Sequence, residues 1–277
     1  MYTHIIFDLD GTLLNTIDDL ADAGNHVCAA HGWPTHTVGQ FKRMVGNGIP
    51  NLVSRFTPDG LSEDELAGAL AEFSAYYGEH KEDKTAPYPG IPELLAALKD
   101  AGVHMAVLSN KAHALAGPVV EHYFPGVFEY VQGALPDAPL KPDPTLLHAM
   151  MKEIGAKPET TLFVGDSNVD VHTGKNGGLT VVGVLWGFRD RQELEGAGVD
   201  YVIERPGQLL NSGPDQNAQA RRRAVGGEDV AETGSVIRCV LCWLATAFFA
   251  LLELADLWWL FKLLPDVLRY GYDWEAG

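Results

Sequence analysis

Short apolar runs alternate with longer amphipathic stretches along most of the first 210 residues. The run HIIF near the N-terminus ends in a turn at Gly11, which indicates a buried strand. Similar runs predict further strands at Val103–Ser109, Leu162–Gly165, Val181–Leu185 and Tyr201–Ile203. Helical patterns lie between them, for example at Pro92–Ala101 and Pro144–Ile154. This alternation is typical of α/β proteins, so we predict a doubly wound sheet of parallel strands.

Residues 16–84 interrupt that alternation. Four helical patterns follow one another there with no convincing strand between them: Ile17–His31, Val38–Val45, Ile49–Phe56 and Ser62–Glu82. Ser62 and Glu65 have the spacing of a capping box, which marks a helix start. The turn residues Tyr88-Pro89-Gly90 mark the return to strands. We therefore predict an α/β core (residues 1–15 and 85–210) that carries an all-helical insertion (residues 16–84), called the cap below.

The composition changes after Leu210. Residues 211–235 are polar and Gly-rich and predict a linker, whereas the pattern of residues 236–277 predicts an apolar helical tail. The window Val236–Ala255 has about the length needed to cross a bilayer. Thr246, Glu253 and Asp256 fall on one helical stripe, which instead suits a helix on a membrane or against a partner protein. We therefore predict that residues 236–264 contact either a membrane or a partner protein.

Charge and cysteine content narrow the function classes. The chain has 20 Lys and Arg against 37 Asp and Glu, a net charge of −17, so nucleic acid is not an expected partner. A small anionic substrate would need local positive groups. Cys28, Cys239 and Cys242 cannot form a disulfide framework, and the N-terminus lacks a secretion pattern. We expect a cytoplasmic catalytic domain, with membrane tethering by the tail as an option, because arginines at 221–223 precede the tail.

Acidic residues follow two of the predicted strands. Asp8 and Asp10 come after the first strand, and Asp166, followed by Asp170, comes after Leu162–Gly165. The carboxyl ends of parallel strands form the ligand crevice of such sheets. Carboxylates so close repel one another unless a cation or a proton intervenes, and oxygen ligands suit Mg²⁺. The sequence therefore predicts a magnesium site.

Two further residues complement these acids. Ser109 ends the predicted strand Val103–Ser109, and Lys141 lies in the segment KPDP. A carboxylate nucleophile, a metal, a hydroxyl and a lysine are the groups that phosphoryl transfer requires.

Four segments now resemble, in order, the motifs of the haloacid-dehalogenase superfamily: DLDGTL at Asp8–Leu13, LSN at Leu108–Asn110, Lys141, and GDSNVD at Gly165–Asp170. The similarity covers about residues 1–210. It implies that Asp8 attacks phosphorus, that Asp10 is the general acid and base, and that Ser109 and Lys141 hold the phosphoryl oxygens. It also implies Mg²⁺ ligands at Asp8, the Asp10 carbonyl and Asp166, with Asp170 orienting ligands or waters.

The cap lies where this superfamily carries a C1-type cap. Its segment FKRMVGNG resembles the cap of phosphoglycolate phosphatases, in which the VGNG turn faces the site. Glycines there let backbone N–H groups approach an anion. The resemblance predicts substrate contacts at Gly11, Thr12, Arg43, Gly46, Asn47, Gly48 and Asn110. Lys42 and Arg43 are equally compatible with an ordinary solvated helix–helix turn. Lys111 fits either a substrate contact or an exposed lysine at a helix start.

The resulting prediction is a magnesium-dependent phosphatase that acts on a small phosphorylated metabolite, with 2-phosphoglycolate favoured. NVDVHTGKNGG and WGFR resemble the same subfamily, whereas Asn15 departs from its usual acidic residue. Pyrophosphatase and phosphomutase activities are alternatives within the superfamily. A membrane or assembly adaptor that uses the fold as a scaffold is the alternative from another class.

Overall fold

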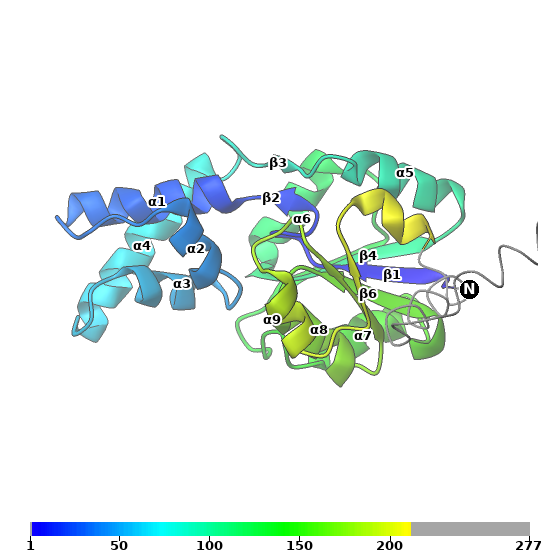
Figure 1. Ribbon diagram of the computed structural model, residues 1–277. Coiled ribbons are helices and arrows are strands. Elements are labelled where there is room, and N and C mark those ends of the chain that lie inside the picture. Colours follow the sequence, from blue (N-terminus) through cyan, green and yellow to red (C-terminus); the bar gives the residue numbers. More distant parts are fainter. Residues whose placement is uncertain (1, 212–277) are drawn as a thin grey trace, which may run out of the picture. The chain divides into compact units, whose positions relative to one another are not determined.

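The computed structural model of the protein describes residues 2–211 (Figure 1). The predicted tail, and the linker beyond residue 211, lie outside this range. Within it, no helix is both long and apolar enough to cross a membrane.

A six-stranded sheet forms the core, in the order β5-β4-β1-β6-β7-β8. Its strands are β1 (His4–Phe7), β4 (His104–Ala112), β5 (Tyr130–Ala134), β6 (Thr161–Gly165), β7 (Thr180–Val184) and β8 (Tyr201–Ile203). All neighbouring pairs are parallel, which confirms the predicted parallel α/β fold. Strand β5 was not predicted, because its sequence YVQGA is only partly apolar. Strand β4 continues past Ser109 to Ala112.

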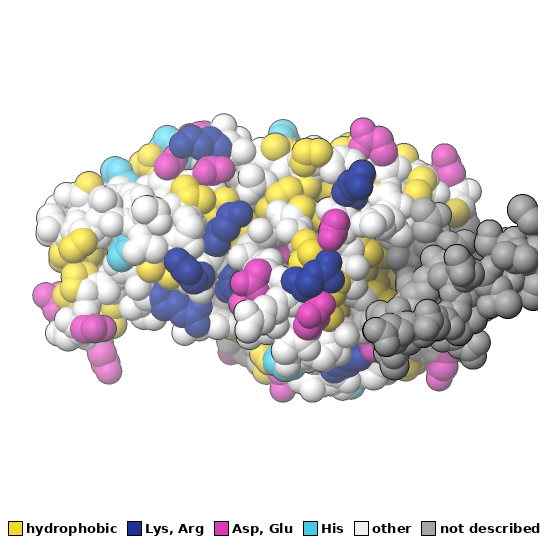
Figure 2. Space-filling view, in the orientation of Figure 1, with side chains coloured by type: hydrophobic (Ala, Val, Ile, Leu, Met, Phe, Trp, Pro, Cys, Tyr) yellow, Lys and Arg dark blue, Asp and Glu magenta, His cyan; other side chains and the backbone are white. Residues whose placement is uncertain are grey.

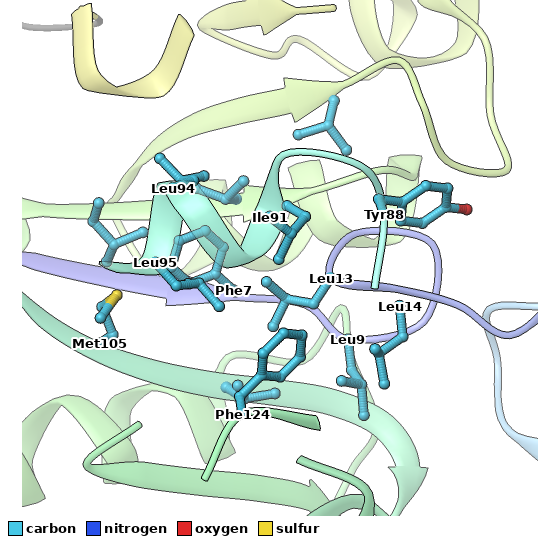
Figure 3. Close-up of a cluster of buried hydrophobic side chains, with 14 of the residues drawn as sticks. Phe7, Leu9, Leu13, Leu14, Tyr88, Ile91, Leu94, Leu95, Met105 and Phe124 are labelled. Carbon is cyan, nitrogen blue, oxygen red and sulfur yellow. The ribbon is translucent and has the colours of Figure 1, made fainter. Parts of the chain in front are cut away.

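Alternate side chains of β1 explain why helices cover both faces of the sheet. Ile5 and Phe7 pack into one buried cluster with residues of α5 (Ile91–Asp100) and α6 (His113–Tyr123), as Figure 3 shows for Phe7, Leu94 and Leu95. Ile6 points the other way, into a second cluster with α7 (Thr145–Glu153) and α8 (Asn168–Asn176). The last core helix is α9 (Arg191–Gly196). Short 3-10 helices lie at Pro158–Thr160 and Pro206–Asn211.

The cap consists of four helices around a hydrophobic cluster that they share with Phe188 of the core. They are α1 (Ile17–Ala30), α2 (Val38–Met44), α3 (Ile49–Phe56) and α4 (Glu63–His80). The capping box predicted at Ser62 and Glu65 is present, with the Ser62 hydroxyl accepting from the Glu65 N–H at 3.3 Å. Phe41, Phe56, Phe73 and Tyr77 from three helices fill the cluster and are fully buried. The cap therefore folds around its own aromatic core.

A short antiparallel ribbon connects the cap to the core (Figure 1). It pairs β2 (Leu14–Asn15) with β3 (Ala86–Pro87), so the chain enters and leaves the cap at adjacent positions. The buried carboxylate of Asp19 accepts hydrogen bonds from the backbone N–H groups of Lys84 and Thr85 and from the Thr85 hydroxyl. These bonds fasten the first cap helix to the returning chain.

On the face drawn in Figure 2, Lys and Arg side chains lie among acidic and hydrophobic ones rather than in one continuous basic patch. Two lysines, Lys111 and Lys141, are instead buried inside the molecule.

Candidate active site

The four motif segments meet at the carboxyl edge of the sheet and line one cavity. Asp8 follows β1 directly, and Asp166 follows β6 directly. These two strands are neighbours, so their ends lie side by side. The core residues of the predicted catalytic and metal set all line the cavity: Asp8, Asp10, Ser109, Lys141, Asp166 and Asp170.

Three of the acids form a compact group. One carboxylate oxygen from each of Asp8, Asp166 and Asp170 lies within 4.8 Å of the others, and all three residues are buried. Burial, and next the charge of Asp170, raises the pKa of Asp8 well above its usual range. The same two causes raise the pKa of Asp166 to about 7. Three close buried carboxylates are therefore unfavourable unless a cation joins them, and their hard oxygen atoms fit Mg²⁺.

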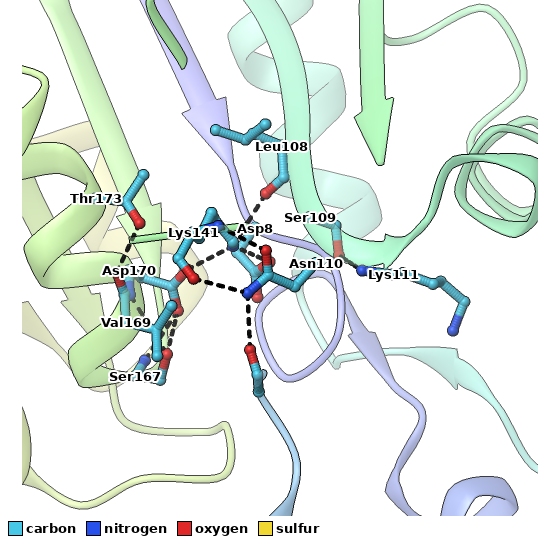
Figure 4. Close-up of polar contacts among 11 residues, drawn as sticks. Asp8, Leu108, Ser109, Asn110, Lys111, Lys141, Ser167, Val169, Asp170 and Thr173 are labelled. Carbon is cyan, nitrogen blue, oxygen red and sulfur yellow. Dashed lines mark hydrogen bonds and ion pairs between the residues drawn. The ribbon is translucent and has the colours of Figure 1, made fainter. Parts of the chain in front are cut away.

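Lys141 supplies part of the missing positive charge. Its Nζ donates to Asp8 Oδ1 at 2.6 Å, to Asp170 Oδ1 at 2.7 Å and to the Leu108 carbonyl at 3.1 Å (Figure 4). Burial alone would lower the pKa of Lys141, but the charges of Asp170 and Asp8 outweigh it and raise the pKa. The ammonium is therefore charged at neutral pH. Among the described residues, no lysine forms a salt bridge with Asp166, so the space beside its carboxylate suits a metal ion.

Backbone groups that the sequence did not reveal hold Asp166 in place. The N–H of Phe188 donates to Asp166 Oδ2 at 2.6 Å. Gly11 and Gly187 lie against the same carboxylate, where a Cβ on either glycine would come within 2.4 Å of Oδ2. Gly11 also has a positive φ of 94°. The segment WGFR contained the signal for Gly187 and Phe188, but only as part of a family resemblance.

Ser109 and Asn110 reach the cavity from an irregular part of β4. The register between β4 and β5 shifts between Leu108 and Ala112. Ser109 is buried, and its hydroxyl accepts from the Lys111 N–H at 3.1 Å. Asn110 Oδ1 accepts from the Lys141 N–H at 2.8 Å. Asn110 Nδ2 donates to the carbonyls of Lys141, at 3.1 Å, and Gly46, at 3.0 Å. Asn110 therefore connects the lysine loop to the cap.

Lys111 is a buried cavity residue, so the alternative of an exposed lysine at a helix start is wrong. It lies within β4, and its Nζ contacts Asp10 Oδ1 at 3.3 Å and the Tyr77 hydroxyl at 2.7 Å. Burial opposes its charge, but Asp10 and Tyr77 outweigh burial and raise the pKa of Lys111. Tyr77 comes from cap helix α4 and was not anticipated, because its position also fits an ordinary core aromatic.

The other predicted substrate residues divide into two groups. Gly46 and Gly48 line the cavity. Arg43 is exposed, and neither Arg43 nor Asn47 lines it. Gly11 and Thr12 do not line the cavity either, and the buried Thr12 hydroxyl has no hydrogen-bond partner among the described residues.

Arg189 fastens the loop that precedes Gly46. Its guanidinium donates to the carbonyl of Val45 at 2.7 Å and to that of Lys42, both in the cap. Its Nε pairs with Glu193 at 3.1 Å. The cap loop is thus held to the core by two side chains, Asn110 and Arg189.

Known proteins match most of the part of the chain that the structure describes. The family model for haloacid dehalogenase-like hydrolases matches residues 5–184. A phosphoglycolate phosphatase of Pseudomonas putida is 34% identical over 206 residues, covering 72% of this chain and 75% of that protein. One of Haemophilus influenzae is 32% identical over 213 residues, covering 74% and 95%.

Solved structures share the fold. The structure of a predicted phosphoglycolate phosphatase from Haemophilus somnus has a TM-score of 0.71 and 28% identity, covering 76% of this chain and 97% of that one. CbbY from Rhodobacter sphaeroides, solved in complex with phosphate, has a TM-score of 0.61 and 25% identity, covering 76% and 96%. The motifs, their meeting at one edge of the sheet and these matches show that the chain belongs to the haloacid dehalogenase-like hydrolases.

Proposed function

We propose that this enzyme is a magnesium-dependent phosphatase that hydrolyses a small phosphate monoester, with 2-phosphoglycolate as the favoured substrate, through an aspartyl-phosphate on Asp8. The observation that carries the proposal is the position of Lys141 Nζ, 2.6 Å from Asp8 within the group of three buried acids. A carboxylate with a fixed ammonium beside it provides both a nucleophile and a partner for phosphoryl oxygens.

The residues have the following roles in this mechanism. Asp8 attacks phosphorus and forms a P–O bond, while the bond from phosphorus to the ester oxygen breaks. Asp10 donates a proton to the departing oxygen and then takes one from the water that hydrolyses the aspartyl-phosphate. Ser109 and Lys141 bind the oxygens of the transferred group.

Asp8, the Asp10 carbonyl and Asp166 would hold Mg²⁺, with Asp170 in support. When bound, Mg²⁺ would offset the negative charge of these acids and of the phosphate. This donor set fits the ion, because the carboxylates of Asp8 and Asp166 are already close and lack a full complement of positive charge.

The names of the relatives, among them phosphoglycolate phosphatases of Pseudomonas putida and Haemophilus influenzae, support 2-phosphoglycolate. Pyrophosphatase and phosphomutase activities would use the same aspartyl-phosphate and stay as alternatives. An adaptor that uses the fold only as a scaffold has no need of buried like charges, so the three-acid group argues against it.

Phosphate release from a panel of esters with Mg²⁺ tests the proposal. The panel contains 2-phosphoglycolate, pyrophosphate and hexose phosphates. We expect Asp8→Asn to lose nearly all turnover while circular dichroism shows an unchanged fold. Asp59→Asn, at an exposed cap position, is the matched control and should keep full activity. More than a few percent of activity in Asp8→Asn would exclude Asp8 as the nucleophile.

The tail gives a separate proposal that rests on sequence alone. We infer that residues 236–264 bind a membrane or a partner protein while the catalytic domain stays on the cytoplasmic side. Fractionation of the full chain against a truncation at Asn211 tests it. Full-length protein that behaves like the truncation without detergent would remove the membrane contact.

A further inference from the structure

We propose that Lys111 binds a carboxylate on the leaving group of the substrate and so selects acidic phosphate esters. The inference rests on the proposed phosphatase function and adds to it the residue that recognises the leaving group. Four acids line the cavity, so a substrate with two anionic groups needs a positive group near each of them.

Three cationic side chains line the cavity among the described residues: Lys111, Lys141 and Arg189. Lys141 is engaged by Asp8 and Asp170, at the phosphoryl end of the site. Arg189 is engaged by Glu193 and by cap carbonyls. Lys111 is the one of these three that is bound to neither the three-acid group nor the cap backbone.

The ammonium of Lys111 has capacity for another ligand. It has three N–H groups, and its contacts are with Asp10, at 3.3 Å, and the Tyr77 hydroxyl, at 2.7 Å. Its side chain is only 4% exposed. The cap side of the cavity is apolar, lined by Leu20, Ile49 and Leu52. A desolvated ammonium in such surroundings attracts an anion more strongly than one in water.

The position of Lys111 matches the expected course of a substrate. In Figure 4 Lys111 lies on the side of Asp8 away from Asp170, whereas Lys141 lies between Asp8 and Asp170. With phosphorus at Asp8 and the leaving oxygen at Asp10, the next atoms of the substrate point toward the residue that contacts Asp10. In 2-phosphoglycolate a single CH₂ separates the ester oxygen from the carboxylate. With its ester oxygen at Asp10, the carboxylate of this short leaving group would therefore lie near Lys111, whose Nζ is 3.3 Å from Asp10 Oδ1.

The cap contributes to the same subsite. Tyr77 of α4 accepts a hydrogen bond from Lys111, and its ring centroid lies 5.0 Å from Nζ. Gly46 and Gly48 of the cap loop line the same cavity. Lys111 is therefore oriented by a cap side chain in a cavity that the cap helps to form.

A pair of matched esters tests the inference. The substrates are 2-phosphoglycolate and 2-hydroxyethyl phosphate, which has nearly the same size but a neutral leaving group. We expect Lys111→Met to lower kcat/KM for both, because Lys111 also contacts Asp10. The loss for 2-phosphoglycolate should be roughly 10- to 100-fold larger, the range expected for losing a hydrogen bond to a charged group. Lys152→Met, at an exposed position, is the control and should leave the ratio of the two values unchanged.

A second variant covers the case in which Lys111→Met does not fold. Tyr77→Phe keeps the ammonium of Lys111 and the aromatic ring beside it, but it removes the hydroxyl that orients Lys111. We expect a loss of about 3- to 10-fold in the same ratio, the effect of one hydrogen bond. Calorimetric titration of 2-phosphoglycolate into Asp8→Asn, with and without Lys111→Met, gives a readout free of turnover. The added Lys111→Met substitution should weaken the binding of 2-phosphoglycolate more than the binding of inorganic phosphate.

The outcomes separate the two proposals. If the wild-type enzyme releases no phosphate from either ester or from any other compound in the panel, the proposed phosphatase function is wrong. The proposed role of Lys111 is then wrong as well. If it hydrolyses 2-phosphoglycolate but both esters lose the same factor in Lys111→Met and Tyr77→Phe, Lys111 acts only through Asp10. The selectivity role is then overturned while the phosphatase function stands.

Discussion

Asn110 Nδ2, in core strand β4, donates a 3.0 Å hydrogen bond to the carbonyl oxygen of Gly46 in the cap. The same side chain is bonded in both directions to the backbone of Lys141. One amide therefore fixes the loop that carries Lys141 and, at the same time, the cap loop at Gly46. The position of the cap loop and that of Lys141 are thereby linked.

Replacing Asn110 should loosen both loops. We expect Asn110→Ala to lower kcat/KM about 10-fold, with a higher KM, because the cap loop and Lys141 lose their shared support. The free energy of unfolding should fall by about 1–3 kcal/mol, since partly buried backbone groups lose their partners. Steady-state kinetics and denaturant unfolding measure these effects. Asn51→Ala is the control, because the Asn51 side chain bonds only to cap backbone. Equal effects of the two variants would contradict the link.

The raised pKa of Asp166 makes a prediction about pH. Burial, and next the charge of Asp170, raises it from 3.8 to about 7. The unfolded carboxyl keeps its ordinary pKa, so the metal-free folded protein binds more protons than the unfolded chain between these two values. Its stability should therefore fall as the pH rises from about 4 to 7. Mg²⁺ replaces the proton, so the stabilisation that it gives should increase over the same window.

Thermal unfolding at pH 5 to 8, in EDTA and in Mg²⁺, measures both trends. Asp166→Asn should flatten the pH dependence in EDTA, although Asp8, whose pKa is also raised, keeps part of it. It should also remove most of the increase in Tm caused by Mg²⁺. A stability of the metal-free wild-type protein that rises across this window would contradict the assignment.

Gly187 should not tolerate a side chain. A Cβ there would come within 2.4 Å of Asp166 and of the Gly11 carbonyl, so Gly187→Ala must displace the carboxylate or the loop. We expect at least a 10-fold loss of Mg²⁺ affinity and a loss of about 1–3 kcal/mol in stability, the usual cost of overpacking. Calorimetric Mg²⁺ titration and unfolding measure the two effects. Gly196→Ala, where a Cβ meets nothing within 4 Å, should change neither, and equal behaviour of the two variants would refute the prediction.

The sequence predicted those parts of the molecule that depend on local pattern. Strand ends followed by acids located Asp8 and Asp166, because the short runs before them are almost entirely apolar and the fold class brings the carboxyl ends together. Strand β5 was missed, since YVQGA has too little apolar character to stand out. A contact between distant residues has no local signal, so Tyr77 on Lys111 required the packed structure.

The exact ends of helices were also predicted less well than the helices themselves. The cap helix predicted at Ser62–Glu82 is observed at Glu63–His80, with its start fixed by a capping box and its end without any such marker. The exposure of Arg43 likewise depends on how α2 packs, which a motif match does not specify.

The ribbon of β2 and β3 has a consequence for protein engineering. Because Leu14 pairs with Pro87 and Asn15 with Ala86, the two junctions of the cap are adjacent and lie outside the six-stranded sheet. A different helical module with equally close ends could be grafted there, and strand β1, which precedes Asp8, would keep its neighbours in the sheet. The same sheet could thus carry different caps, and we expect exchange of this one segment to change which ester the enzyme accepts.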